Sequence, residues 1–244
     1  MRIVTRTIHN ESILVLSDIH LKLNSDQNYV LLKKVLKETE AEIIIFNGDI
    51  FDYIFASKKF FQDYWKDFFN LCKELRSHGK DVYFIEGNHD FGFEHFDLDH
   101  GFKDQGDFEL RLDHPVLGLM IIRHGDDIVC PWHYHWFRRF VKSNLFQKIA
   151  CLFPGSWMFY LFNLVAKASR SQDRYRKMTQ AKVLQKIQNS GILKQTIQTL
   201  VLGHVHLWLD QLLNETRVLI GPSWDDLPNG LLLEKDGTIS RIRY

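Results

Sequence analysis

The sequence predicts an α/β fold, and three observations lead to this prediction. Short apolar runs such as 43–46 end abruptly in glycine and polar residues, as buried parallel strands do. Between two of these runs, Tyr29, Leu32 and Leu36 recur at helical spacing, which predicts a strand, a crossover helix and a second parallel strand. Apolar or alternating runs between 207 and 233 predict an antiparallel layer near the C-terminus.

The elements follow in order along the chain. A helix is expected from the N-cap candidates Ser25 and Asp26 to about Glu40, and a second one from Phe60 to His78, with Gly79 as its stop. Five strands are expected, over Glu11–Ser17, Ile43–Phe46, Val82–Ile85, Val116–Arg123 and Thr199–Leu202.

Polar side chains follow each of these five strands. Residues two apart beyond a strand share a face, so Asp18 with His20, and His204 with His206, can converge on one point. The strand exits together offer two carboxylates, one amide and four imidazoles, a set suited to borderline divalent metals such as manganese, iron(II) or zinc. The seven candidates are Asp18, His20, Asp49, Asn88, His124, His204 and His206.

Seven ligands are too many for one tetrahedral ion, but they fit two ions that share Asp49. Paired metal ions are the usual arrangement for hydrolysing phosphate esters and anhydrides, because a hydroxide between the ions attacks while both neutralise the developing charge. We therefore expect a two-metal hydrolase, with manganese as the first expectation and iron(II) or zinc as alternatives.

Composition sets limits on the class of protein. The chain has 244 residues and a formal net charge of +1, which suits one large globular domain. Its three cysteines, Cys72, Cys130 and Cys151, lack the paired spacing of a disulfide framework or a thiolate zinc site, so a reducing compartment is expected. The polar N-terminus lacks the apolar core of a secretory signal, and cytoplasm is the expected location.

Residues 131–177 differ from the rest of the chain. They carry nine basic residues and one acidic residue, a net charge of +8 that leaves −7 elsewhere, together with many aromatic residues. Ile149–Ala166 is uncharged and long enough to suggest a membrane helix, but Pro154 and Gly155 interrupt it. We expect a helical cap inserted between core segments 1–130 and 178–244, with apolar residues toward an acyl chain or membrane and basic residues toward phosphates. A cap packed wholly on its own core is the alternative.

Five motifs together resemble those of the calcineurin-like metallophosphoesterase superfamily. They are Asp18-x-His20, Gly48-Asp49-x-x-Asp52, Gly87-Asn88-His89-Asp90, His124-Gly125-Asp126 and Gly203-His204-x-His206. The resemblance implies a four-layer α/β/β/α sandwich. It also implies that one ion is held by Asp18, His20, Asp49 and His206, and the other by Asp49, Asn88, His124 and His204. His89 would face the substrate and stabilise charge or protonate a leaving oxygen, with Asp90 orienting it.

The chain is further similar to one branch, the UDP-2,3-diacylglucosamine hydrolases of lipid A synthesis. The shared features are Gly48–Phe51, His124–Asp126 running into the cap, Pro154, and Gly221–Trp224. This similarity implies cleavage of the pyrophosphate to UMP and 2,3-diacylglucosamine 1-phosphate, at the cytoplasmic face of the inner membrane of a Gram-negative bacterium, without nucleic acid as a partner. The substrate contacts it implies are Asn88, His89, Trp132, Ser169, Asp173, Arg176 and His204.

Two positions depart from that branch. Best-known members have arginine at the position of His89 and an acidic residue near that of Trp132, so a different lipid substrate stays open. A phosphodiesterase or nuclease, with the basic cap gripping nucleic acid, is a second hypothesis. A non-catalytic scaffold is a third, and it is disfavoured because none of the seven candidate ligands is lost.

Overall fold

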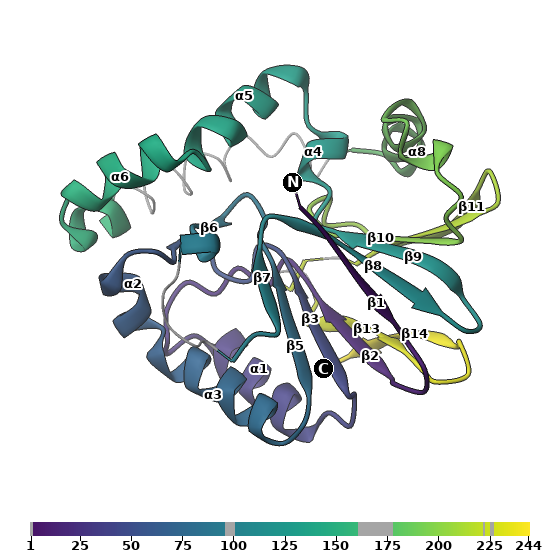
Figure 1. Cartoon of the computed structure of the whole chain (residues 1–244), viewed down its shortest axis with the longest axis horizontal. Coiled ribbons are helices and arrows are strands. Elements are labelled where there is room, and N and C mark those ends of the chain that lie inside the picture. The colour runs from purple at the N-terminus through teal and green to yellow at the C-terminus, as the bar shows by residue number, and fades with distance from the viewer. Residues whose placement is uncertain (1, 96–100, 161–177, 222, 225–226) are drawn as a thin grey trace.

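The computed structural model describes residues 2–95, 101–160, 178–221, 223–224 and 227–244. In Figure 1 two twisted sheets lie face to face, helices cover their outer faces, and a further pair of helices extends over one end. The fold is therefore mixed α/β, as the sequence predicted.

The first sheet contains the strands nearest the chain's start. Its order is β14-β13-β2-β3-β5-β7, with β2, β3, β5 and β7 parallel and β13 antiparallel to β2. Helices α1 (Gln27–Glu38), α2 (Lys59–Tyr64) and α3 (Lys66–Ser77) belong to this side. The strand bounds are β2 Ile13–Leu16, β3 Ile43–Asn47, β5 Asp81–Ile85, β7 Asp104–Gly106, β13 Asn229–Leu233 and β14 Ile239–Arg243.

The second sheet has the order β1-β8-β9-β10-β12-β11, in which β9, β10 and β12 are parallel neighbours. Helix α8 (Gln180–Asn189) and the 3₁₀ turn η2 (Ile192–Lys194) cover it. The strand bounds are β1 Arg2–Thr7, β8 Phe108–His114, β9 Gly118–Arg123, β10 Thr199–Leu202, β11 Leu209–Leu213 and β12 Thr216–Ile220. A short pair, β4 (Ile54–Phe55) and β6 (Asp90–Phe91), and η1 (Phe93–His95) lie beside the first sheet.

Three apolar clusters hold these layers together. One packs α1 to α3 on the first sheet, the second lies between the sheets, and the third packs α8 on the second sheet. Alternation along β3 explains the division, because Ile44 and Phe46 face the helices whereas Ile43 and Ile45 face the other sheet. This is the four-layer α/β/β/α arrangement that the resemblance implied.

Some local expectations differ from the structure. The helix expected over 60–78 is interrupted at Trp65, whose indole is buried, so α2 and α3 are separate helices. Asp26 provides the N-cap of α1 by accepting from the amide of Asn28, whereas Ser25 has no such part. Strand β1 was not expected, because its polar side chains are mostly exposed and its pairing with β8 is nonlocal.

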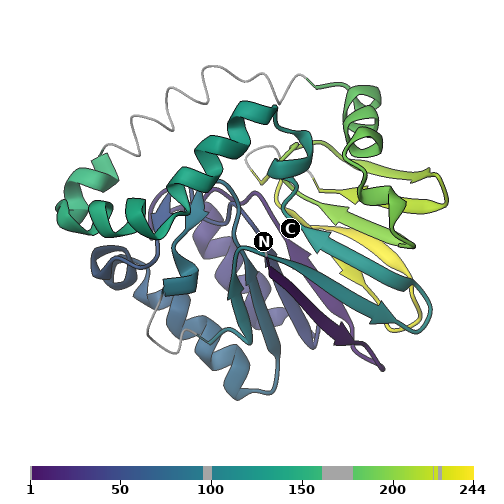
Figure 2. The same cartoon turned by 45° about the horizontal axis from the view of Figure 1, so that its top comes forward.

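The inserted segment is helical where the structure describes it. After α4 (Asp126–Val129) come α5 (Trp132–Val141), α6 (Asn144–Leu152) and helical residues 155–160. Figure 2 shows α5 and α6 running across the end of the molecule above the first sheet. Among the described residues, no helix has the length and apolar character needed to cross a membrane. The membrane helix considered for Ile149–Ala166 is thus broken at Pro154 in the part that can be followed.

Candidate metal centre

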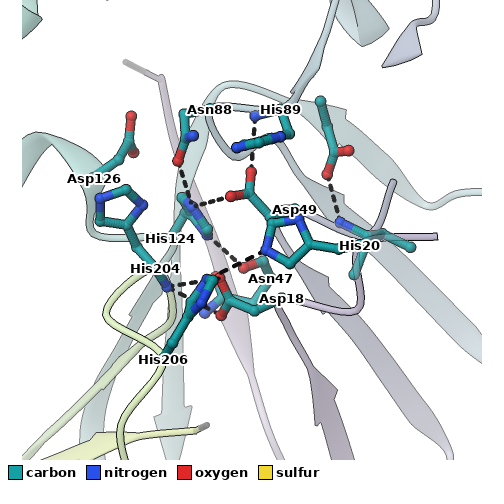
Figure 3. A network of polar contacts seen from close by, with 12 residues as sticks. Asp18, His20, Asn47, Asp49, Asn88, His89, His124, Asp126, His204 and His206 are labelled. Atoms are coloured by element: carbon teal, nitrogen blue, oxygen red, sulfur yellow. Dashed lines mark hydrogen bonds and ion pairs between the residues drawn. The ribbon is translucent and has the colours of Figure 1, made fainter. Parts of the chain in front are cut away.

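Five strand ends meet at one edge of the two sheets. In one sheet β2, β3 and β5 are parallel neighbours, and in the other β9 and β10 are. Parallel neighbours end on the same side, so the residues that follow them lie together. Figure 3 shows these side chains pointing toward one another. All seven ligands expected from the sequence are in this group: Asp18, His20, Asp49, Asn88, His124, His204 and His206.

The backbone at these strand ends adopts an uncommon conformation. Five of the seven residues have positive φ angles: Asp18 (53°), His20 (54°), Asp49 (53°), His204 (67°) and His206 (57°). This left-handed conformation costs a non-glycine residue about 1 kcal/mol or more. Among the other non-glycine residues that the structure describes, positive φ angles occur at two consecutive turn residues between β11 and β12. Strain concentrated at the candidate ligands indicates a functional site.

Two glycines allow the loops to approach closely. A β-carbon at Gly48 would lie 2.3 Å from Nδ1 of His124, and one at Gly87 would lie 2.1 Å from Oδ1 of Asp49. Both distances are far inside van der Waals contact. Glycine at position 48 therefore lets the β3 loop approach His124, and glycine at position 87 lets the β5 loop approach Asp49.

The first group of potential ligands consists of Asp18, His20 and His206, whose donor atoms lie within 4.8 Å of one another. Nε2 of His206 lies 3.2 Å from Nε2 of His20 and 3.2 Å from Oδ1 of Asp18. The amide of His204 donates to both oxygens of Asp18 at 3.0 Å and fixes that carboxylate. Residues from the two sheets are thus joined directly.

Asp49 belongs to both remaining groups, one with His20 and His89 and the other with His124 and His204. Its Oδ1 accepts from the amide of His89 at 2.8 Å, and its Oδ2 lies 3.4 Å from Nε2 of His124. The central position of Asp49 in Figure 3 is the one that a shared ligand requires.

The second group is extended and oriented by two asparagines. Nε2 of His124 lies 3.2 Å from Oδ1 of Asn88. On the other side of the same ring, Nδ1 donates to the backbone carbonyl of Asn47 at 3.0 Å. That bond assigns Nε2 as the nitrogen directed to the centre, as second-shell hydrogen bonds do for metal-binding histidines. The sequence reasoning assigned no role to Asn47, because a backbone carbonyl leaves no signal in the sequence.

The imidazoles of the centre are in different protonation states. Burial, with the charge of His89 next in importance, lowers the pKa of His20 to about 3, and burial together with His124 lowers the pKa of His204 to about 4. Burial acts in the same direction on His124, but the Asp49 carboxylate outweighs it and raises the pKa of His124 to about 10. At neutral pH His20 and His204 are thus neutral, whereas His124 carries a proton beside Asp49.

These residues fit divalent cations. Asp18 and Asp49 are 0% and 1% exposed, and two carboxylates so deeply buried in one cluster are costly unless cations offset their charge. Imidazole nitrogens converge on the same points as the carboxylate oxygens, which is the donor set of borderline metals. The centre can therefore hold divalent ions, and the shared position of Asp49 suits a pair.

The contact expected between Asp90 and His89 is replaced by another arrangement. The buried Asp90 carboxylate accepts from the amides of Ile50 and Phe51 at 2.9 and 3.1 Å, so it supports the Asp49 loop. The His89 ring is held instead by the backbone carbonyl of Asp52, 2.5 Å from Nδ1. Asp90 is therefore corrected from an orienting partner of His89 to a support for the loop, because its two oxygens are directed to amides.

Of the four substrate contacts expected in the insertion, the structure describes one. Ser169, Asp173 and Arg176 lie outside the described residues. Trp132 begins α5 and is 74% exposed, with its ring edge-on to that of His133. Cys130, which the sequence left without a role, is buried with Sγ 3.3 Å from Nε2 of His204.

Comparisons with known proteins agree with this geometry. The family model described as calcineurin-like phosphoesterase matches residues 11–218. A UDP-2,3-diacylglucosamine hydrolase from Blochmanniella pennsylvanica (strain BPEN) is 25% identical over 80% of this chain and 79% of its own. One from Blochmanniella floridana is 26% identical over 71% of this chain and 74% of its own.

Solved structures resemble the chain more distantly. A single mutant of Vps29 from Entamoeba histolytica has a TM-score of 0.44 and 14% identity, and covers 96% of this chain and 99% of its own. An archaeal phosphodiesterase gives the same TM-score and coverage at 13% identity. With the family model spanning all five strand ends, the chain belongs to the calcineurin-like phosphoesterase family.

Proposed function

We propose that the chain hydrolyses the pyrophosphate of a lipid-linked nucleotide sugar, most specifically UDP-2,3-diacylglucosamine, to UMP and 2,3-diacylglucosamine 1-phosphate. The family consists of hydrolases that use divalent metals, and two curated relatives carry the name of this activity. The observation that carries the proposal is the convergence of the seven assigned nitrogen and oxygen donors beside a helical insertion with exposed apolar residues.

The candidate ligands divide into two sets around Asp49. We assign Asp18, His20, Asp49 and His206 to one ion, and Asp49, Asn88, His124 and His204 to the other. Two divalent ions, when bound, would supply an activated water and neutralise charge on the phosphoryl group. Manganese is our first candidate, because the donor set combines carboxylate and imidazole without thiolates.

His89 is the residue we assign to proton transfer. Its Nδ1 donates to the Asp52 carbonyl, which leaves Nε2 as an acceptor in the neutral ring and as an acid in the protonated ring. The ring lies edge-on to His20, with centroids 5.0 Å apart, and against Tyr53 at 4.6 Å. These contacts hold it beside the centre, where it can stabilise or protonate the leaving oxygen.

The insertion provides the surface for the lipid part of the substrate. Nine of the fourteen exposed large apolar side chains among the described residues lie between 132 and 160. Exposed apolar groups at this density mark an interaction surface, and the basic residues among them suit phosphates. We propose that this surface also contacts the anionic inner-membrane face from which the substrate is taken. Ser169, Asp173 and Arg176 remain proposed substrate contacts, with Asn88, His89, Trp132 and His204.

The test is release of UMP from UDP-2,3-diacylglucosamine by manganese-loaded protein. Asp49→Asn is the inactive control, since it removes the ligand shared by both sets. If the manganese-loaded protein releases no UMP but still hydrolyses bis(4-nitrophenyl) phosphate, the proposed substrate is wrong and the assignment as a hydrolase stands.

A phosphodiesterase or nuclease is the second candidate, and the histidine at position 89 favours it, because this residue follows the general superfamily pattern. Steeply salt-dependent binding of single-stranded DNA, accompanied by cleavage, would support that candidate. Absence of both with active UMP release would exclude it.

A further inference from the structure

Helix α5 carries two different faces. Tyr134, Arg138 and Lys142 follow one another at intervals of four residues, and so they lie along one stripe. Trp132, Trp136 and Phe140 are displaced from this stripe by two residues, which is about 200° around a helix. These three aromatic side chains are more than half exposed, whereas those of Arg138 and Lys142 are 14% and 12% exposed. The polar stripe therefore faces the protein.

The side chains of this polar stripe form hydrogen bonds and ion pairs with three acidic side chains of the core. Nε of Arg138 donates to Asp126 at 2.8 Å, and its two terminal nitrogens donate to both oxygens of Asp107, at 2.9 and 2.6 Å. The hydroxyl of Tyr134 donates to the same oxygen of Asp126 at 2.6 Å. Nζ of Lys142 lies 3.0 Å from Oε2 of Glu86 and 3.5 Å from Asp107.

The acidic residues stand beside the candidate metal centre. Asp126 follows His124 by two residues and lies on the same side of the centre as His124 and His204 in Figure 3. Glu86 precedes Asn88 by two residues, and its other oxygen accepts from the amide of Phe93 at 2.7 Å. One helix of the insertion is thus bound to the loops that carry two ligands from different sheets.

The geometry of these contacts makes the attachment specific. Arginine to aspartate with two parallel hydrogen bonds fixes both distance and orientation, unlike a single contact from a flexible chain. Removing Arg138 would leave Asp107 with Lys142 at 3.5 Å and Asp126 with the neutral hydroxyl of Tyr134, which is unfavourable for two partly or wholly buried carboxylates. Apolar contacts tolerate a shift of a helix along its axis, whereas these directional contacts are satisfied in a single position of α5 relative to the core.

We propose that Arg138, supported by Tyr134 and Lys142, is a positioning residue that sets the location of the inserted helix relative to the metal centre. Its consequence is a fixed separation between the surface that holds a large substrate and the reacting phosphorus. The inference rests on the proposed function only in the choice of the large substrate. Small phosphodiesters are too short to reach α5 in this proposal, so their hydrolysis should not depend on Arg138.

The experiment compares Arg138→Met with Arg76→Met, a matched control in which an exposed helical arginine of α3, outside the insertion, is replaced. For Arg138→Met we expect KM for UDP-2,3-diacylglucosamine to rise about tenfold, because misplacement of bound groups is costly. Manganese content and kcat/KM for bis(4-nitrophenyl) phosphate should stay within about twofold. Amide exchange in α5 should be about tenfold faster, and Arg138→Lys should restore part of both effects.

The outcomes separate the inference from the proposed function. The positioning role would be overturned if Arg138→Met left both the amide exchange rate of α5 and the KM for the lipid substrate unchanged. It would also be overturned if the variant lost activity equally on both substrates and lost bound manganese as well. If the wild-type protein does not act on the lipid substrate, the proposed function fails. The inference is then decided on Arg138→Met by two measurements: faster amide exchange in α5 with unchanged diesterase activity supports it, and unchanged exchange overturns it. If Arg138→Met does not fold, Tyr134→Phe and Lys142→Met must show the same pattern at smaller size, and its absence there overturns the role.

Discussion

The candidate metal centre and the inserted helices differ in which side chains they bury and which they expose. In the centre, polar side chains are buried at the ends of apolar strands, and their backbone is held in left-handed conformations. In the insertion, large apolar side chains face outward, while a polar stripe on α5 is buried against the core. The candidate centre is therefore internal, whereas the insertion lies outside the sheets and joins the core in two ways. Helix α5 is held by charged contacts, and residues further along, such as Met158 and Phe159, pack on the apolar cluster that includes Phe61.

Replacement of Asp49, the ligand that we propose is shared by both ions, gives the largest expected effect and tests whether the centre acts as one unit. In Asp49→Asn, activity should fall roughly a thousandfold or more, because bound ions supply several kcal/mol of charge stabilisation. Metal analysis should show loss of bound manganese, while circular dichroism shows an intact fold. Full activity and metal content in this variant would refute the assignment of the site.

Replacement of His89 separates proton transfer from metal binding within the centre. His89→Ala should lower kcat about a hundredfold or more, the usual contribution of a general acid. Manganese content should be unchanged, since His89 is not among the seven assigned ligands. Loss of metal together with activity would instead place His89 among the ligands, as its group with His20 and Asp49 allows.

The protonation of His124 predicts how metal binding depends on pH. Its pKa of about 10 means that the metal-free centre holds a proton at neutral pH, which a metal must displace. His20 and His204, with pKa values of about 3 and 4, are already neutral and release none. Manganese affinity should therefore rise about tenfold per pH unit between 6.5 and 8.5. Calorimetry in buffers of different ionisation enthalpy should show release of about one proton, and a pH-independent affinity would contradict this assignment.

The smallest expected effect concerns the exposed surface of the insertion. Trp136→Ser and Leu152→Ser should each weaken binding to anionic lipid vesicles about fivefold to tenfold, because each removes apolar area available to the bilayer interface. Leu212→Ser, on β11, removes a side chain of similar exposure (73%) and should leave vesicle sedimentation unchanged. Equal effects from all three variants would show that the insertion has no special contact with lipid.

The sequence by itself determined the candidate centre. Parallel neighbours end on one side of a sheet, so the polar residues just after Leu16 and Asn47 lie together. Those after Leu202 follow a strand of the other sheet, and the packing of the two sheets brings them to the same place. The α/β class followed from the same runs of apolar residues. Family membership was likewise predicted from five local motifs, and the family model confirmed it.

Tertiary structure alone decided which groups orient these residues. The partners of His89, His124 and Asp90 are backbone carbonyls and amides, which every residue has and no sequence pattern marks. Tyr134, Arg138 and Lys142 are four residues apart, a spacing that the sequence analysis did not use, and their acidic partners Asp126, Asp107 and Glu86 come from three separate segments. Long-range pairing of this kind depends on how the two sheets and the insertion pack, and the sequence does not encode that locally.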